Sequence, residues 1–100
     1  MIDETLRDYL LHIVEATRKS DELELGASPR ASLALCKAAQ AWAAVNGRSY
    51  VLPDDIKRLA GPVLGHRLIP NSHARLRGRR PDQILDDIVR GVPVPIQRQG

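Results

Sequence analysis

The chain has 100 residues, a formal net charge of +3, and contents of 43% hydrophobic and 27% charged residues. This length allows one domain with a single modest core and excludes two such domains. Aromatic residues make up only 3% of the chain and Phe is absent. The core must therefore be built from Leu, Ile, Val and Ala, a composition that favours helices over a β-sandwich.

The sequence carries no signal for export or for a membrane span. No apolar run approaches the roughly 20 residues that cross a bilayer. Residues 1 to 15 contain Asp3, Glu4 and Asp8 where a signal peptide needs basic residues followed by an apolar stretch. We therefore expect a cytoplasmic protein. Cys36 is the only cysteine, so no internal disulfide can form and we interpret it as a buried apolar residue.

Apolar residues recur at helical spacing in the first segment and predict a helix from about Glu4 to Arg18. Its stripe consists of Leu6, Tyr9, Leu10, Ile13, Val14 and Thr17. Beyond a polar break, Leu23 and Leu25 alternate with charged residues. This alternation predicts a short extended piece.

A second helix is predicted from Ser28, as N-cap, to about Val45. Pro29 favours this start because proline at the first helical position has no amide to leave unpaired. Eight alanines lie between residues 27 and 44, so neighbouring helices can approach closely and we expect this helix to be central. The stripe includes Leu33, Cys36, Ala39 or Gln40, and Ala43, with Leu35, Ala38, Trp42 and Val45 beside it. We expect the Trp42 ring to be mostly buried.

Two more helices complete the pattern. Pro53 and two following carboxylates open a helix to about Leu68, in which Gly61-Pro62 predicts a kink or a restart. Pro81-Asp82 opens the last helix, and Gly91 closes it. Tyr50 to Leu52 is β-prone but too short for a sheet. The sequence therefore predicts an all-α fold, a small four-helix bundle within residues 1–95, followed by a C-terminal tail at 96–100.

The motifs of common catalytic and metal sites are absent from the sequence. It has no G-x-x-x-x-G-K-[ST] run and no G-x-G-x-x-G after a strand, so it is not a complete nucleotidase. His12, His66 and His73 do not form an H-E-x-x-H pattern, so we predict no metal site. We therefore do not expect this chain by itself to be an enzyme.

Positive charge is concentrated in the second half of the chain. Residues 1 to 50 carry a formal charge of −1 and residues 51 to 100 carry +4. The excess lies mainly in Arg75, Arg77, Arg79 and Arg80. Such a basic loop is typical of phosphate or nucleic-acid contact or of a solvated surface. The solvated surface is favoured because no aromatic residue is interleaved for stacking on bases.

The segment Gly26-Ala-Ser-Pro-Arg30 places an arginine at a helix start, where an acidic residue is preferred. The free amides of that first turn, the Ser28 hydroxyl and the Arg30 guanidinium could together bind a phosphate. On the residues alone, a solvated Arg30, or one paired with Glu22 or Glu24, is favoured over this anion site.

Four motifs occur in a characteristic order along the chain. They are Tyr9-x-x-x-Ile13-Val14-x-Ala16-Thr17-Arg18, Leu25-Gly-Ala-Ser-Pro-Arg-Ala31, Gly47-Arg48-x-Tyr50-Val51-x-Pro53-Asp54-Asp55-Ile56 and Leu64-x-His66-Arg67-Leu68. In this order and spacing the chain resembles the C-terminal lid of the MoxR family of AAA+ ATPases. The resemblance covers about residues 3 to 95 and extends to Val92-Pro-Val-Pro95.

The resemblance implies that residues 1–95 form an AAA+ lid domain and that Arg30 is its sensor 2 arginine. In AAA+ proteins this arginine reaches the γ-phosphate of ATP, bound with Mg²⁺ on a larger αβα domain. Ser28 and Arg30 would then be the nucleotide-binding residues of the lid, and Arg30 the catalytic one. Walker A, Walker B, sensor 1 and the arginine finger would lie upstream in a longer parent chain, of which Met1 is not the natural start.

The resemblance also implies partners for the parent chain. Family members are thought to be chaperone-like ATPases that form hexameric rings. They work with proteins that carry von Willebrand factor A domains, often in metal insertion or in the maturation of complexes. No residue in the sequence identifies a client.

Five further residues match family positions: Arg48, Asp54, Asp55, His66 and Arg67. We interpret both aspartates as first-turn acids of the third helix, with Arg48 or Arg67 as ion partners, and so as scaffold. Two other functions stay open. One is a small helical nucleic-acid-binding module that uses Arg75 to Arg80, and the other is a free-standing protein-interaction bundle.

Overall fold

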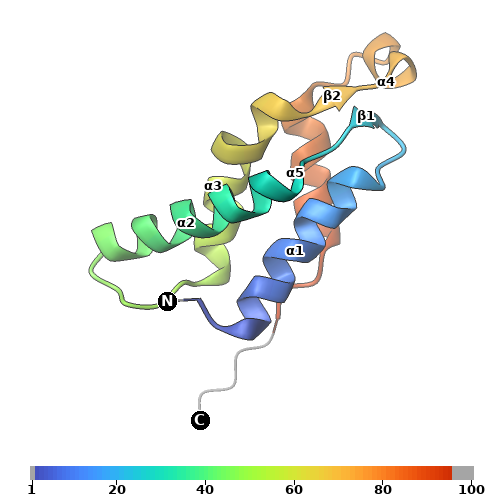
Figure 1. The fold of residues 1–100 in the computed structure, drawn as a ribbon. Helices are drawn as coiled ribbons and strands as arrows, with labels where there is room; N and C mark the ends of the chain where they lie inside the picture. The colour runs from blue at the N-terminus through green and yellow to red at the C-terminus, as the bar shows by residue number, and fades with distance from the viewer. Residues whose placement is uncertain (1, 96–100) are drawn as a thin grey trace.

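A computed structural model describes residues 2–95 and confirms the all-α class (Figure 1). Within this range there are five α-helices, one 3₁₀ helix and a two-stranded ribbon. The helices are α1 (Glu4–Arg18), α2 (Pro29–Val45), α3 (Pro53–Leu64), η1 (Gly65–Arg67), α4 (Ser72–Leu76) and α5 (Pro81–Gly91), and the strands are β1 (Leu23–Leu25) and β2 (Ile69–Pro70). The tail predicted at 96–100 lies outside the described residues.

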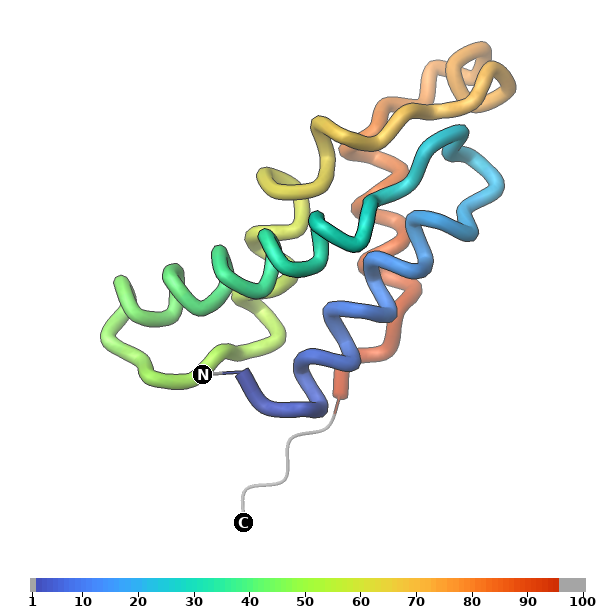
Figure 2. Tube along the Cα trace, viewed as in Figure 1, coloured from blue at the N-terminus to red at the C-terminus, as the bar shows by residue number. Residues whose placement is uncertain are grey.

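The four predicted helices correspond to α1, α2, α3 and α5, which pack around one core. Figures 1 and 2 show α4 and the two strands at one end of the molecule and the N-terminus toward the other. Each long helix contributes fully buried side chains, for example Leu10, Leu35, Ile56 and Ile84. The fifth helix, α4, lies in the segment predicted as a basic loop, where five residues are too few to show an apolar stripe.

Side-chain caps account for where two of the long helices begin. The Asp3 carboxylate accepts from the amide of Leu6 at 2.9 Å and starts α1. The Ser28 hydroxyl accepts from the amide of Ala31 at 3.3 Å, which confirms it as the N-cap of α2. Each cap satisfies a backbone donor that the first helical turn leaves without a partner.

The third predicted helix ends earlier than expected. Its α-helical part stops at Leu64 and the chain continues as η1, whereas the pattern predicted a helix to Leu68. Pro62 lies within the last turn of α3, and it has no amide to donate to the carbonyl four residues earlier. Beyond η1, β2 pairs antiparallel with β1, so the extended piece predicted around Leu23 and Leu25 is confirmed.

Helix α2, which was expected to be central because of its alanines, is buried along one face only. The buried positions recur every four residues: Ala31, Leu35, Ala39 and Ala43. Leu33 and Val45, predicted in or beside the stripe, are 57% and 81% exposed. Cys36 is half-buried against the core, so its interpretation as a buried residue is wrong.

Trp42 is mostly buried, as predicted, but it lies outside the core. The guanidinium carbon of Arg58 lies 4.7 Å from the centre of its ring. The small side chains of Ala39 and Ala43 occupy the core positions of this part of α2. Trp42 therefore lies at the edge of the α2 and α3 contact, where a cation–π contact covers its ring.

A bidentate ion pair fixes the connection between α2 and α3. Arg48 donates to both carboxylate oxygens of Asp55, at 2.7 and 2.8 Å. The same carboxylate accepts from the amide of Leu52 at 2.7 Å and so caps α3. Asp55 is 3% exposed whereas Asp54 is exposed. The scaffold role predicted for Arg48 and Asp55 is confirmed.

We predict that this pair makes stability pH-dependent. The hydrogen bonds from Arg48, together with that from Leu52, hold the pKa of Asp55 below its usual value despite burial. Because the pKa is lower in the folded state, the stabilisation is present above the unfolded pKa of about 3.9 and is lost as the pH falls. Asp55→Asn should lower the free energy of unfolding by about 3 kcal/mol at pH 7 and by less at pH 3.

Urea unfolding at both pH values measures this difference. Asp54→Asn is the matched control, because Asp54 is the neighbour of Asp55 in the same helical turn but is exposed. An equal effect of the two substitutions at pH 7 would contradict the assignment.

Candidate functional site

A buried threonine joins the end of α1 to the loop before α2. The Thr17 hydroxyl donates to the carbonyl of Val14 at 2.6 Å and accepts from the amide of Ala27 at 2.9 Å. Thr17 and Ala27 are 1% and 2% exposed. A single buried hydroxyl therefore fixes the loop against the last turn of α1.

Gly26 allows the same loop to lie close to α1. A Cβ atom at this position would lie 2.6 Å from the carbonyl oxygen of Thr17 and 2.7 Å from the Cα of Arg18. Both neighbours are backbone atoms, so neither can move away as a flexible side chain would. The close approach of the loop to α1 therefore requires glycine at position 26, within the second motif.

The loop leads directly into the residues predicted to bind nucleotide. Ser28 caps α2, Pro29 occupies its first turn, and Arg30 follows on the exposed surface. The first turn of α2 contains no acidic residue. Glu22, one predicted partner of Arg30, instead pairs with Arg79 at 2.8 Å. Ser28 and Arg30 thus lie together at the positive end of the α2 dipole.

An open cavity of about 490 Å³ lies beside this helix start. Its lining comes from α1, β1, the loop, the start of α2 and η1, and consists of Arg18, Glu24, Leu25, Gly26, Ala27, Ser28, Pro29 and Arg67. The lining thus includes two arginines, one glutamate and a helix N-terminus, a balance that favours an anion. Arg30 is not among the lining residues.

The cavity corrects one sequence-based expectation. Arg67 was expected as an ion partner of Asp54 or Asp55, yet it lines this cavity and Arg48 alone pairs with Asp55 within the described residues. Arg18, the last residue of the first motif, lines it as well. Arg18 and Arg67 both lie within the motifs that carry the family resemblance. That resemblance was the only indication in the sequence that either residue belongs to a functional site.

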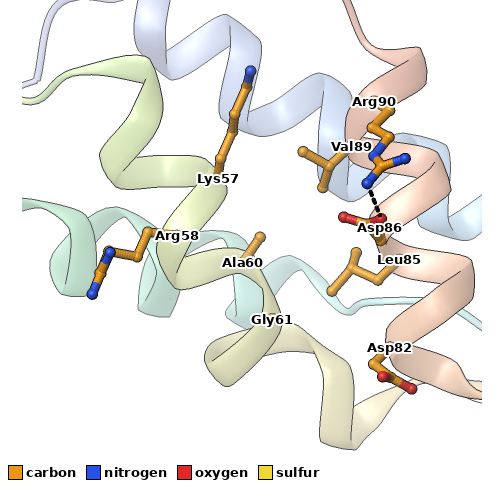
Figure 3. A pocket seen from close by; sticks show the side chains of 9 residues that line it. All are labelled: Lys57, Arg58, Ala60, Gly61, Asp82, Leu85, Asp86, Val89 and Arg90. Atoms are coloured by element: carbon orange, nitrogen blue, oxygen red, sulfur yellow. Dashed lines mark ion pairs between the residues drawn. The ribbon is translucent and has the colours of Figure 1, made fainter.

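A second concave surface lies between α3 and α5 and has a different character (Figure 3). Its volume is about 350 Å³ and its floor is apolar, formed by Ala60, Leu85 and Val89. On its rim Asp86 and Arg90 pair at 3.0 Å, and Figure 3 shows Arg58 directed away from α5. The groove is lined by three basic residues, Lys57, Arg58 and Arg90, and by two acidic residues, Asp82 and Asp86, and neither Ser28 nor Arg30 lies on it.

The described part of the chain holds neither a metal-binding cluster nor a membrane-spanning helix. Among residues 2–95, no three His, Cys, Asp or Glu side chains lie close enough together to hold a metal ion. Over the same range, no helix combines the length and apolar character that a membrane span requires. The predicted basic segment is partly neutralised, because Arg79 pairs with Glu22 and Asp87 and Arg80 pairs with Asp82.

Comparison with known proteins identifies the class. The family model of the AAA lid domain matches residues 15–88. An uncharacterized protein, YeaC, from Bacillus subtilis is 43% identical over 96% of this chain and 30% of its own length. The chaperone MoxR1 of Mycobacterium tuberculosis is 35% identical over 94% of this chain and 27% of its own.

A solved structure agrees with these relatives. The crystal structure of a "putative ATPase" from Cytophaga hutchinsonii superposes with a TM-score of 0.88 and 37% sequence identity. The match covers 96% of this chain and 32% of that protein. The chain thus spans about 30% of the length of the relatives it matches.

The chain belongs to the AAA lid domain family. More narrowly, it is the C-terminal lid of a MoxR-family AAA+ ATPase, as the order of its motifs had indicated. The lid therefore belongs to a family of ATPases.

The close approach at Gly26 leads to a prediction about stability. Gly26→Ala should lower the free energy of unfolding by about 1–3 kcal/mol, because the added methyl group overpacks against the backbone of α1. Denaturant unfolding of the purified chain measures this loss. Gly91→Ala serves as the control, since a Cβ atom there meets nothing within 4 Å. Equal stabilities of the two variants would contradict the proposed contact.

Proposed function

We propose that this chain closes as a lid over ATP and Mg²⁺ held by an αβα domain of a longer parent chain, and that Arg30 is its sensor 2 arginine. The observation that carries the proposal is the fixed start of α2. Thr17 and Gly26 hold the loop in place, so Arg30 projects from a defined position on an exposed helix end. Membership of the AAA lid family supports the same assignment.

The residues at this site suit a contact with phosphate. The Arg30 guanidinium is planar and permanently charged, so it can donate two hydrogen bonds to one phosphate group. It lies at the positive end of the α2 dipole, where an anion is stabilised and a second cation is not. Ser28 lies two residues earlier and lines the neighbouring cavity. In this proposal Ser28 and Arg30 are the nucleotide-binding residues of the lid.

The lid supplies only a small share of the contacts that a nucleotide and its metal need. A triphosphate with Mg²⁺ requires a phosphate-binding loop, a metal-binding acid and a residue that orients water. The sequence contains no Walker A motif. We therefore assign hydrolysis to the parent chain, with its Walker motifs, sensor 1 and arginine finger in the upstream domain.

The wider biology of the parent chain follows from its family. We propose a cytoplasmic, chaperone-like ATPase that forms hexameric rings and acts with proteins carrying von Willebrand factor A domains, in maturation or metal insertion. The name of one relative, the chaperone MoxR1, supports the chaperone role. The nucleic-acid-binding alternative loses support, because ion pairs engage Arg79 and Arg80, two of its four arginines.

Substitution of Arg30 in the parent chain tests the proposal. Arg30→Ala should lower kcat for ATP hydrolysis by roughly 10- to 1000-fold, because a cationic contact to the transferring phosphoryl group is lost. Arg30→Lys should recover only part of the rate, since lysine keeps the charge without the planar fork. Nucleotide affinity should change less than kcat.

The matched control is Arg7→Ala, which removes an exposed arginine from α1. It should leave hydrolysis at the wild-type rate. Circular dichroism should show a folded lid in all three variants, because Arg30 is exposed. Wild-type hydrolysis by Arg30→Ala would remove the support for the sensor 2 assignment.

A further inference from the structure

The segment from Asn71 to Arg80, here called the α4 hairpin, is held firmly to the rest of the lid. The Asn71 side chain caps α4 through the amide of Ala74 at 2.9 Å and donates to the carbonyl of Asp21 at 2.6 Å. Ala74 is 1% exposed and anchors the short helix in the core. Figure 2 shows this hairpin at the far end of the molecule from the N-terminus.

Arg79 anchors the other side of the hairpin. Its guanidinium donates to both carboxylate oxygens of Glu22, at 2.8 and 3.2 Å, and also to Asp87 of α5. Gly78 adopts a positive φ of 75°, which lets the chain turn back from α4 toward this anchor. The hairpin is thus attached both to the turn before β1, through Asp21 and Glu22, and to α5, through Asp87. It therefore has a defined conformation before any partner binds.

The anchored hairpin presents an apolar side chain between cations. Leu76 is 88% exposed, the largest exposure among the exposed large hydrophobic residues of the described chain. Arg75 and Arg77 flank it in sequence and are both exposed. Residues 71 to 81 contain no Asp or Glu. Arg77 also feels the Glu22 carboxylate of the neighbouring turn, but Arg75 and Arg77 together keep a positive excess beside Leu76 that carboxylates of a partner can match.

We propose that the α4 hairpin is a docking surface for an acidic segment of a partner protein. Carboxylates of that segment pair with Arg75 and Arg77, and an apolar side chain of the segment packs on Leu76. Because the hairpin is already ordered, little conformational entropy is lost from this side on binding. This surface lies apart from Arg30 and its cavity, so the inference is independent of the proposed nucleotide contact.

An acidic protein fits this surface better than a nucleic acid. Phosphates would use the two arginines but would leave Leu76 exposed to water. The hairpin also contains no aromatic residue on which a base could stack. Burial of a leucine side chain contributes to affinity only when the partner supplies apolar surface.

The test uses the whole chain and two fluorescent acidic peptides, which differ only in carrying one central Leu or one central Ser among glutamates. In fluorescence anisotropy titrations, the Leu peptide should bind about tenfold more tightly than the Ser peptide. Leu76→Ser should abolish that difference. The double substitution Arg75→Gln with Arg77→Gln should weaken both peptides about tenfold or more.

Two control variants test whether the loss of any exposed leucine or any exposed arginine would change peptide binding in the same way. Leu33→Ser removes another exposed leucine, from α2, and Arg7→Gln removes an exposed arginine from α1. Neither should change the affinity for either peptide. Leu76 contributes little to the core at 88% exposure, so all variants should give the helical circular dichroism spectrum of the parent sequence.

Three results would overturn the proposal. One is absence of binding by both peptides, and another is equal affinity for the two peptides in the unchanged chain. The third is tighter binding of a DNA duplex of the same charge as the peptides, lost on substitution of Arg75 and Arg77. That last result would assign the hairpin to nucleic acid.

Discussion

The hydrogen bond from the Ala27 amide to the Thr17 hydroxyl is the contact on which the functional end of this lid depends. The bond is buried. Its two residues lie ten positions apart in the sequence, one in the first motif and one in the second. Without it, the Ala27 amide would lack a partner in the core, at a cost of about 1–3 kcal/mol. Gly26 adds a steric condition, since only a residue without Cβ lets the loop lie this close to α1. Together they fix where α2 begins.

Two other connections of the lid are fixed by arginines with carboxylate partners. Arg48 and Asp55 order the passage from α2 to α3, and Arg79 with Glu22 and Asp87 orders the passage from α4 to α5. These arginines are part of the scaffold. Arg30 differs from them, because it lies exposed at a helix start without an acidic residue in its turn. This contrast separates the arginines that hold the fold from the one we assign to nucleotide.

Local chemistry made much of the fold predictable from the sequence. Caps and prolines defined the starts of α2 and α5, and a clear apolar stripe defined α1 from Glu4 to Arg18. The five-residue helix α4 was missed because its order comes from contacts with Asp21 and Glu22, which are about 50 residues distant in the chain. Such contacts leave no periodic signal in a sequence.

The candidate site was predictable only in part, and for a similar reason. Ser28 was found from capping preference, and Arg30 gained its role from the family resemblance. Arg67 was predicted to pair with Asp54 or Asp55, whereas it lines the cavity beside the start of α2. The order of residues along the chain does not show that η1 turns toward that helix start. Helical phase predicted that Trp42 is mostly buried, but it did not show that Ala39 and Ala43 fill the core positions beside it.

The central claim is that the contact between α1 and the loop positions Arg30 for its work on ATP. A double-mutant cycle in the parent ATPase, with Thr17→Val and Arg30→Ala, measures this coupling directly. Thr17→Val alone should lower kcat for ATP hydrolysis while the lid stays folded by circular dichroism. In the Arg30→Ala background the same substitution should cause no further loss. Independent, multiplicative losses from the two substitutions would contradict the account.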